Sequence, residues 1–169
     1  IIATPAGGHC NNSSKTYSIA PVEHANSYTW FFNGGTQWTA SSSTTTWITV
    51  TSGTLTTTSA TLSVCANNDC GTSSTFTKII DPLYTPSSPL AINKPATHCY
   101  GTIRSYSVDP VVGATTYLWS INNSAWLITG SGSSVNISAG TGSATISVSA
   151  ANNCGASTPI KTDVVPWYT

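Results

Sequence analysis

Apolar and polar side chains alternate with a period of two along many short stretches of this chain. Tyr28, Trp30 and Phe32 share one face of such a stretch, and the segment 60–66 places Leu62 and Val64 on one face. A period of two is typical of a β-strand with one buried face. Gly, Pro or Asn residues bound each stretch, and no segment has a convincing helical period. The pattern predicts an all-β chain of antiparallel sandwiches, with about seven short strands in each.

The chain also repeats itself. Residues 60–71 (ATLSVCANNDCG) have a twin at residues 144–155 (ATISVSAANNCG), and other segments recur in the same order. The matched pairs are 9–10 with 98–99, 17–19 with 106–108, 28–30 with 117–119, Trp38 with Trp126, and 48–50 with 135–137. We therefore predict two modules, residues 1–85 and 86–169. Residues 81–95 carry four prolines and predict a semi-rigid linker. Residues 165–169 match 81–85, which suggests a piece of a longer array.

Composition excludes several classes of function. Charged residues are 6 % of the chain and the formal net charge is zero, so few cations are present to neutralise a phosphate backbone, and we expect no nucleic-acid partner. No apolar run is long enough for a transmembrane helix, so we expect no membrane insertion. Six Trp and seven Tyr supply material for a core, which argues against disorder.

Four of the five cysteines occupy matched places in the repeat: Cys10 with Cys99, and Cys70 with Cys154. Matched cysteines without metal-binding spacing predict disulfides and an extracellular location. Repeat equivalence suggests the pairs Cys10–Cys70 and Cys99–Cys154, each worth about 4 kcal/mol in the chain-entropy model. In a standard immunoglobulin-type sandwich, however, these positions lie at opposite ends, beyond the Cα separation limit of about 7 Å. A Cys65–Cys70 bridge and a contact between repeats stay open.

The sequence predicts no metal, no cofactor and no catalytic centre. Each module offers one His beside one Cys, whereas zinc needs about four converging ligands. The carboxylates are scattered, whereas a glycosidase needs two that face each other. No Gly-x-Ser-x-Gly motif is present for a serine nucleophile.

The tryptophans are the remaining candidates for ligand contact. Trp30 and Trp119 lie among alternating inward residues and are predicted core anchors. Trp38, Trp47 and Trp126 are also expected to be buried at sheet edges. If they were instead exposed in a row, they would form a strip that stacks on sugar rings, and their exposure decides between the two interpretations.

The ordered set of motifs resembles the tandem PKD-like, immunoglobulin-like repeats of surface proteins and gliding-type adhesins that Bacteroidota export by type IX secretion. The second module carries the set as Cys99, Tyr106–Val108, the segment 113–119 (GATTYLW) and the segment 143–155. The first module departs from it at residues 23–26 (EHAN), where Gly-Ala is missing, and at the additional Cys65. The resemblance implies β-sandwiches at the cell surface with a spacer or adhesive role, and it supplies no catalytic residues.

Two functions follow as predictions. The first is a non-catalytic extracellular segment that acts as a structural spacer or adhesive module, with neighbouring repeats or the protomers of a surface filament as partners. The second is a carbohydrate-binding accessory module of a secreted enzyme, with surface polysaccharide as its partner.

Overall fold

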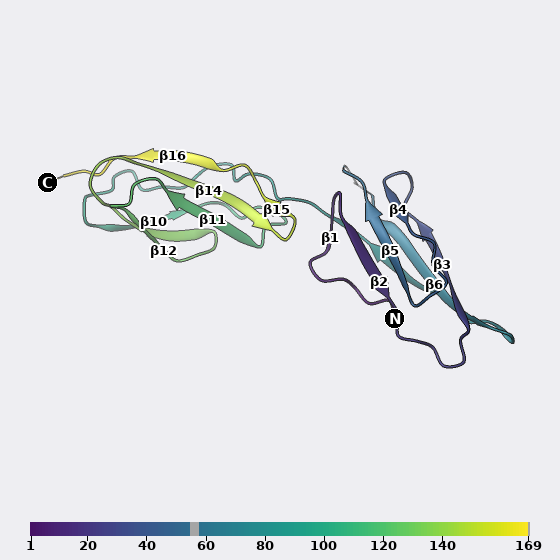
Figure 1. Cartoon of the computed structure of the whole chain (residues 1–169). Helices are drawn as coiled ribbons and strands as arrows, with labels where there is room; N and C mark the ends of the chain where they lie inside the picture. Colours follow the sequence, from purple (N-terminus) through teal and green to yellow (C-terminus); the bar gives the residue numbers. More distant parts are fainter. Residues whose placement is uncertain (55–57, 169) are drawn as a thin grey trace. The chain divides into compact units, whose positions relative to one another are not determined.

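The computed structural model describes residues 1–54 and 58–168, and these residues form β-strands and loops without a helix. The chain divides into two compact units, Ile1–Tyr84 and Thr85–Thr169, called module 1 and module 2 below (Figure 1). The predicted all-β class with two tandem sandwich modules is confirmed. The division falls inside the proline-rich segment 81–95.

Module 1 packs two small antiparallel sheets face to face. One has the order β2-β5-β4, and the other has the order β3-β6-β7 with β8 also paired to β6. The strands are β2 (Ser14–Ser18), β3 (Ser27–Asn33), β4 (Trp38–Ala40), β5 (Trp47–Ser52), β6 (Ala60–Asn68), β7 (Gly71–Thr72) and β8 (Phe76–Ile80). β6 and β8 form an antiparallel pair, in which Ala60 lies opposite Ile80 and Val64 opposite Phe76.

Module 2 repeats this plan. One sheet has the order β10-β13-β12, and the other has the order β11-β14-β15 with β16 paired to β14. The strands are β10 (Ile103–Ser107), β11 (Thr116–Ile121), β12 (Leu127–Thr129), β13 (Ser134–Ser138), β14 (Ala144–Asn152), β15 (Gly155–Ala156) and β16 (Ile160–Val164). Both copies of the repeated motif are therefore nine-residue strands that end in an Asn-rich turn.

A short parallel pair closes one end of each module. In module 1, β1 (His9–Cys10) lies beside β9 (Pro82–Leu83), with Cys10 opposite Leu83. Module 2 keeps a single parallel bridge at the matched place, between Cys99 and Trp167. The alternation of residues did not predict β1 or β9, because a two-residue strand has no period.

Each core fills the space between its two sheets. In module 1, Tyr17 of β2, Ile48 and Val50 of β5 and Leu62 of β6 are at most 3 % exposed. The alternation arises because successive side chains of a strand point to opposite faces. The core of module 2 contains the matched residues Tyr106, Val135, Ile137 and Ile146.

The tryptophans divide differently from the prediction. Trp38 and Trp126 are 3 % exposed and belong to the cores, as expected. Trp30 and Trp119, the predicted core anchors, are only half-buried and pack against the edges of the cores. Their indole N–H groups donate to loop carbonyls, Thr45 O at 2.9 Å and Gly132 O at 3.0 Å, which keeps one side of each ring near solvent.

Candidate functional site

Each module buries one histidine in a cluster of aromatic side chains. In module 1, His9 is 2 % exposed, its Nδ1 lies 3.1 Å from the Tyr17 hydroxyl, and its Nε2 lies 3.0 Å from the Ser13 carbonyl oxygen. The edge of the imidazole meets Trp38, with ring centroids 4.7 Å apart. A carbonyl only accepts, so Nε2 carries the proton and donates to Ser13, while Nδ1 accepts from the tyrosine hydroxyl. The hydrogen bonds therefore fit a neutral imidazole.

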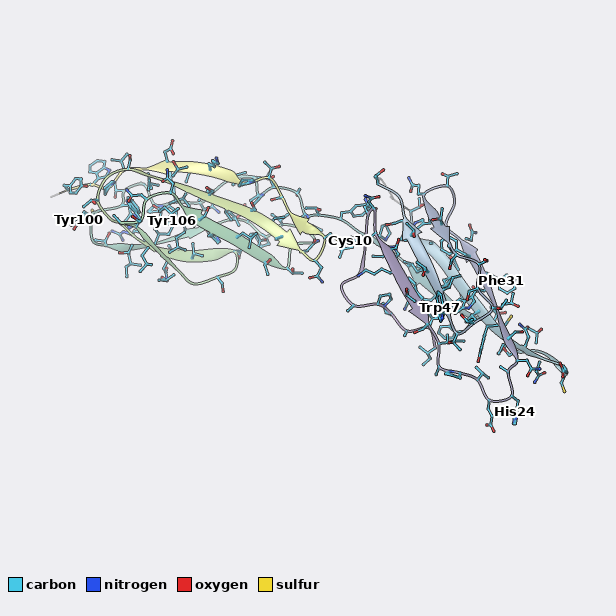
Figure 2. All side chains as sticks on the ribbon, in the orientation of Figure 1. Cys10, His24, Phe31, Trp47, Tyr100 and Tyr106 are labelled. Carbon is cyan, nitrogen blue, oxygen red and sulfur yellow. The ribbon has the colours of Figure 1, made fainter. Side chains whose placement is uncertain are left out.

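Module 2 contains the same cluster in the same places. His98 Nδ1 lies 3.0 Å from the Tyr106 hydroxyl and Nε2 lies 2.9 Å from the Thr102 carbonyl oxygen. The ring meets Trp126 edge-on at 5.4 Å between centroids. Figure 2 shows Tyr106 inside the module, whereas Tyr100 is at one end of it. The recurrence of His, Tyr and Trp indicates a structural unit of the repeat.

Burial sets the protonation of module 1's cluster. It lowers the pKa of His9, and Lys15 lowers it further, while the hydrogen bond to Ser13 opposes the shift. Burial also raises the pKa of Tyr17 to about 12 and raises the pKa of Tyr106. Because both ring nitrogens are hydrogen-bonded, the histidine holds the loop before β2 in place and has no free nitrogen for acid–base work.

The titratable side chains outside the histidine clusters are scattered. Within residues 1–54 and 58–168, no three His, Cys, Asp or Glu side chains are grouped closely enough to hold a metal ion. A pocket of about 310 Å³ opens beside the turn after β6. Among its described lining residues the only carboxylate is Glu23, which lies 3.3 Å from the exposed His24 imidazole. A single solvated carboxylate does not provide the acid–base pair of a glycosidase.

The structure separates the cysteines that repeat equivalence pairs. Cys10 lies opposite Leu83, close to the start of β6, whereas Cys70 lies beyond the far end of that strand. Nine residues at about 3.3 Å each span about 30 Å, which exceeds the disulfide limit of about 7 Å. Figure 2 shows the same separation, because Cys10 is at one end of module 1 and His24, which accepts a hydrogen bond from Asn68, is at the other.

The same separation holds for Cys99 and Cys154 in module 2. Cys99 pairs with Trp167 near the start of β14, and Cys154 follows that strand's last residue. Cys65, Cys70 and Cys99 are free thiols, whereas Cys10 and Cys154 are in the disulfide-bonded state. The structure therefore contains neither within-module bridge, Cys10–Cys70 or Cys99–Cys154, nor the Cys65–Cys70 alternative. The objection from strand geometry is the physical reason.

The turns that carry Cys70 and Cys154 are built alike. The backbone N–H of Cys70 donates to Asn68 Oδ1 at 2.9 Å, and that of Cys154 donates to Asn152 Oδ1 at 2.8 Å. Each asparagine also uses its amide to hold a second loop, His24 O at 3.1 Å and Gly113 O at 3.0 Å. The following glycine has a positive φ, 138° at Gly71, which is strained for other residues. The Asn-x-Cys-Gly sequence thus presents a cysteine on a fixed turn.

The three tryptophans proposed for sugar contact do not form a row. Trp38 and Trp126 are buried, and their indole N–H groups donate to Thr58 O at 2.7 Å and Gly142 O at 3.0 Å. Trp47 is half exposed, at 50 %, on β5 of module 1 (Figure 2). The preferred expectation of burial therefore holds for two residues and not for Trp47.

One exposed aromatic cluster was not predicted. Tyr100, Trp167 and Tyr168 are 52 %, 62 % and 62 % exposed, and the two tyrosine rings lie 5.6 Å apart. We call these three residues the aromatic end of module 2. Repeat matching aligned Trp167 and Tyr168 with residues of the linker, so their exposure had no signal in the alternation of the strands.

A further finding concerns membranes. Among the described residues there is no helix of the length and apolar character needed to cross a bilayer.

Comparison with known proteins places both modules in one family. The model of the PKD-like domain matches twice, at residues 2–79 and 85–164. No curated protein matches the chain.

A solved structure shares the fold. Domains A168–A170 of titin superpose with a TM-score of 0.63 at 14 % identity, covering 99 % of this chain and 66 % of that one. The FN1–FN3 domains of chicken CNTN1 give a TM-score of 0.48 at 17 % identity, with 98 % and 66 % coverage. The chain thus spans just under two thirds of the length of these two neighbours. The family model covers almost the whole sequence in two copies, so the chain belongs to the PKD-like domain family.

Proposed function

We propose that this chain is a non-catalytic structural or adhesive segment, in which two PKD-like modules act as spacers of a larger extracellular surface protein. One observation carries the proposal. The buried histidine is the polar group best placed for chemistry, yet in both modules its two ring nitrogens are engaged in the same hydrogen bonds. The hydrogen bonds that recur in both modules therefore stabilise the fold of each module.

Two further features support an extracellular setting. Disulfide-bonded cysteines persist in oxidising compartments, and Cys10 and Cys154 are in that state. Charged residues make up only 6 % of the chain, and the strand surfaces rely on Ser and Thr hydroxyls, such as the 2.9 Å pair between Ser63 and Thr77. The motifs also resemble type IX-secreted adhesins of Bacteroidota, and we propose that this chain comes from such a surface protein.

Single-molecule stretching tests the spacer role. We would pull the full chain from its two ends in reducing buffer, so that no disulfide shortens the extension. Two independent sandwiches should give two separate force peaks. A module of about 84 residues contains about 300 Å of extended chain at 3.6 Å per residue, and each step should approach that length less the folded module. Extension without steps would contradict the role.

Carbohydrate binding is the competing function. Burial removes Trp38 and Trp126 from contact with any ligand, so the predicted strip is reduced to Trp47. Affinity electrophoresis in gels that contain soluble polysaccharides provides the test. We expect the wild type and Trp47→Ala to migrate alike with and without each polysaccharide, and retardation that Trp47→Ala abolishes would favour the sugar-binding function instead.

A further inference from the structure

The two free surface thiols lie on complementary ends of the repeat. Cys70 is exposed on the turn after β6 of module 1, and Cys99 is partly exposed beside Trp167 in module 2. The repeat equivalent of Cys70 is Cys154, and that of Cys99 is Cys10. Both of these equivalents are disulfide-bonded. The chain therefore presents two free thiols at different repeat positions. Cys70 lies on the turn after the long strand, and Cys99 lies at the position that Cys10 has in module 1.

In module 2, neighbouring residues cover the turn after β14, which carries Cys154. In module 2, the Thr85 hydroxyl donates to the Cys154 carbonyl at 3.3 Å, and a Cβ on Gly155 would lie 3.5 Å from that hydroxyl oxygen. Ser88 donates to Thr158 O at 2.7 Å and holds the same segment down. The covering residues directly follow a Pro-Leu-Tyr sequence at 82–84.

The turn after β6 lacks this cover. Among the described residues, nothing lies within 4 Å of a Cβ placed on Gly71. The pocket of about 310 Å³ opens there, lined by Val22, Ala25 and the Cys70 turn. Val22 is 48 % exposed, so the rim of the pocket includes an exposed apolar side chain.

The matching surface is the aromatic end of module 2. Pro166-Trp167-Tyr168 repeats the pattern of Pro82-Leu83-Tyr84, and it brings Trp167 next to Cys99 through the parallel bridge. Exposed Trp and Tyr are the side chains that most often anchor protein interfaces. The chain is uncharged overall, so no net repulsion opposes self-association.

We propose that a second copy of this chain docks end to end, with the aromatic end of one copy on the open Cys70 turn of the next, and that Cys99 and Cys70 then form an intermolecular disulfide. Because the two surfaces differ, this contact is head-to-tail and can propagate into a filament. The proposal deepens the spacer function and names its partner.

The bond needs an oxidant, for which we name a small-molecule disulfide such as oxidised glutathione. The Cys99 or Cys70 thiolate attacks the small disulfide and releases one glutathione thiolate, which takes up the proton. The second protein thiolate then attacks the mixed disulfide and releases the other glutathione. Two protein thiols are oxidised by two electrons, and one oxidised glutathione is reduced to two thiols.

Complementary variants test the direction of the link. All proteins carry Cys65→Ser, which removes the buried thiol, and are incubated with a glutathione redox buffer. This parent should give a ladder of covalent oligomers on non-reducing gels. Adding Cys70→Ser or Cys99→Ser should leave each protein monomeric when alone. An equimolar mixture of the two should give a dimer and nothing larger, because only one thiol of each kind is then available.

Peptide mapping identifies the bond. Trypsin cuts after Lys15, Lys78, Arg104 and Lys161, while Pro95 protects Lys94, so in the Cys65→Ser background each cysteine falls on its own peptide. The dimer should contain peptide 16–78 linked to peptide 79–104. Covalent dimers of either single-thiol variant alone, a monomeric mixture, or a Cys70–Cys70 link would overturn the proposal. A Cys70–Cys99 bond in monomeric parent protein would do so as well.

The docking surface has its own test. Trp167→Ala should slow dimer formation in the mixture about tenfold, as expected for loss of an anchor worth about 1.4 kcal/mol. Trp47→Ala, which removes an equally large exposed ring from module 1, is the control and should leave the rate unchanged. Equal rates for both variants would overturn docking by the aromatic end. A monomeric result throughout would leave two-step unfolding under force intact, so the two proposals fail separately.

Discussion

The two modules keep the same interior and differ at their ends. Tyr17, His9 and Trp38 of module 1 have counterparts in module 2 with nearly the same hydrogen-bond distances and the same edge-on contact between His and Trp, although the loops between them differ in sequence. At the ends, Leu83 is replaced by Trp167, and a turn that is covered beside Cys154 is open beside Cys70. The comparison teaches that the repeat fixes the hydrogen-bonded interior of each module, while the residues at the module ends vary.

The buried indoles should show the largest effect of disrupting this interior. Trp38→Ala and Trp126→Ala remove core rings that are 3 % exposed, and each is expected to lower the free energy of unfolding of its module by about 3–5 kcal/mol. Hydrogen exchange of the full chain, followed by mass spectrometry of peptides from each module, measures both effects separately.

Trp47→Ala is the matched control for these two variants. Its ring is 50 % exposed, so its removal should cost less than about 1 kcal/mol. If Trp38→Ala and Trp126→Ala differed by several kcal/mol, the two interiors would not be equivalent in spite of their shared contacts.

The histidines should give the next largest effect. His9→Ala leaves the Tyr17 hydroxyl without its partner, whereas the Ser13 carbonyl still accepts the Ser52 N–H at 3.0 Å. His98→Ala does the same in module 2, where Tyr106 loses its partner and the Thr102 carbonyl still accepts the Ala139 N–H at 3.0 Å. One unsatisfied buried hydroxyl costs about 1–3 kcal/mol, so we expect a loss of about 1–3 kcal/mol per variant. Urea unfolding of the full chain, with exchange protection to assign the module, is the measurement.

A double variant sharpens the argument for the histidine cluster. Tyr17→Phe removes the hydroxyl that otherwise remains unpaired, so His9→Ala should cost less in the Tyr17→Phe background than in the wild type. Simple additivity of the two changes would mean that the hydrogen bond between them contributes nothing measurable.

Most of the fold followed from the sequence because its strands are long enough to show a period. The nine-residue strands β6 and β14 carry alternating Leu, Ile and Val, and their twin spacing revealed the modules. The two-residue strands β1 and β9 gave no such signal, because their formation depends on a parallel contact between residues some 70 positions apart, His9 with Pro82. Local pattern carries no information about such a contact.

The candidate sites were harder to predict for a related reason. Repeat equivalence correctly identified Cys10 and Cys70 as matched to Cys99 and Cys154, yet equivalence says nothing about distance, and strand length separates each proposed pair. The buried role of His9 and His98 was also missed, since a histidine beside a cysteine in a polar loop looks like a surface residue. Only its hydrogen bonds to Tyr17 and Ser13 explain its burial.

Substitutions in the Asn-x-Cys-Gly turns should lower the free energy of unfolding less than the changes above. Asn68→Ala removes the acceptor for Cys70 N–H and the donor to His24 O, and should destabilise module 1 by about 1 kcal/mol. Asn68→Asp keeps the acceptor and should recover part of the loss. Because Thr85 covers the matched turn in module 2, Asn152→Ala should increase exchange of the turn amides less than Asn68→Ala does. Equal increases would show that the cover does not protect the turn.

Acid should reveal the smallest difference, through His9. Its pKa is lowered in the folded state, so the unfolded chain, with a pKa near 6.5, binds the proton first. The stability that the neutral ring contributes is complete above pH 6.5 and is lost as the pH falls below that value toward the folded pKa. The slope cannot exceed about 1.4 kcal/mol per pH unit for one proton. Urea unfolding between pH 7 and pH 5 should therefore show a steeper decline for the wild type than for His9→Gln, which has an amide in place of the titrating ring. Identical slopes would mean that the ring accepts a proton in place, with the Tyr17 hydroxyl turning to accept the new N–H.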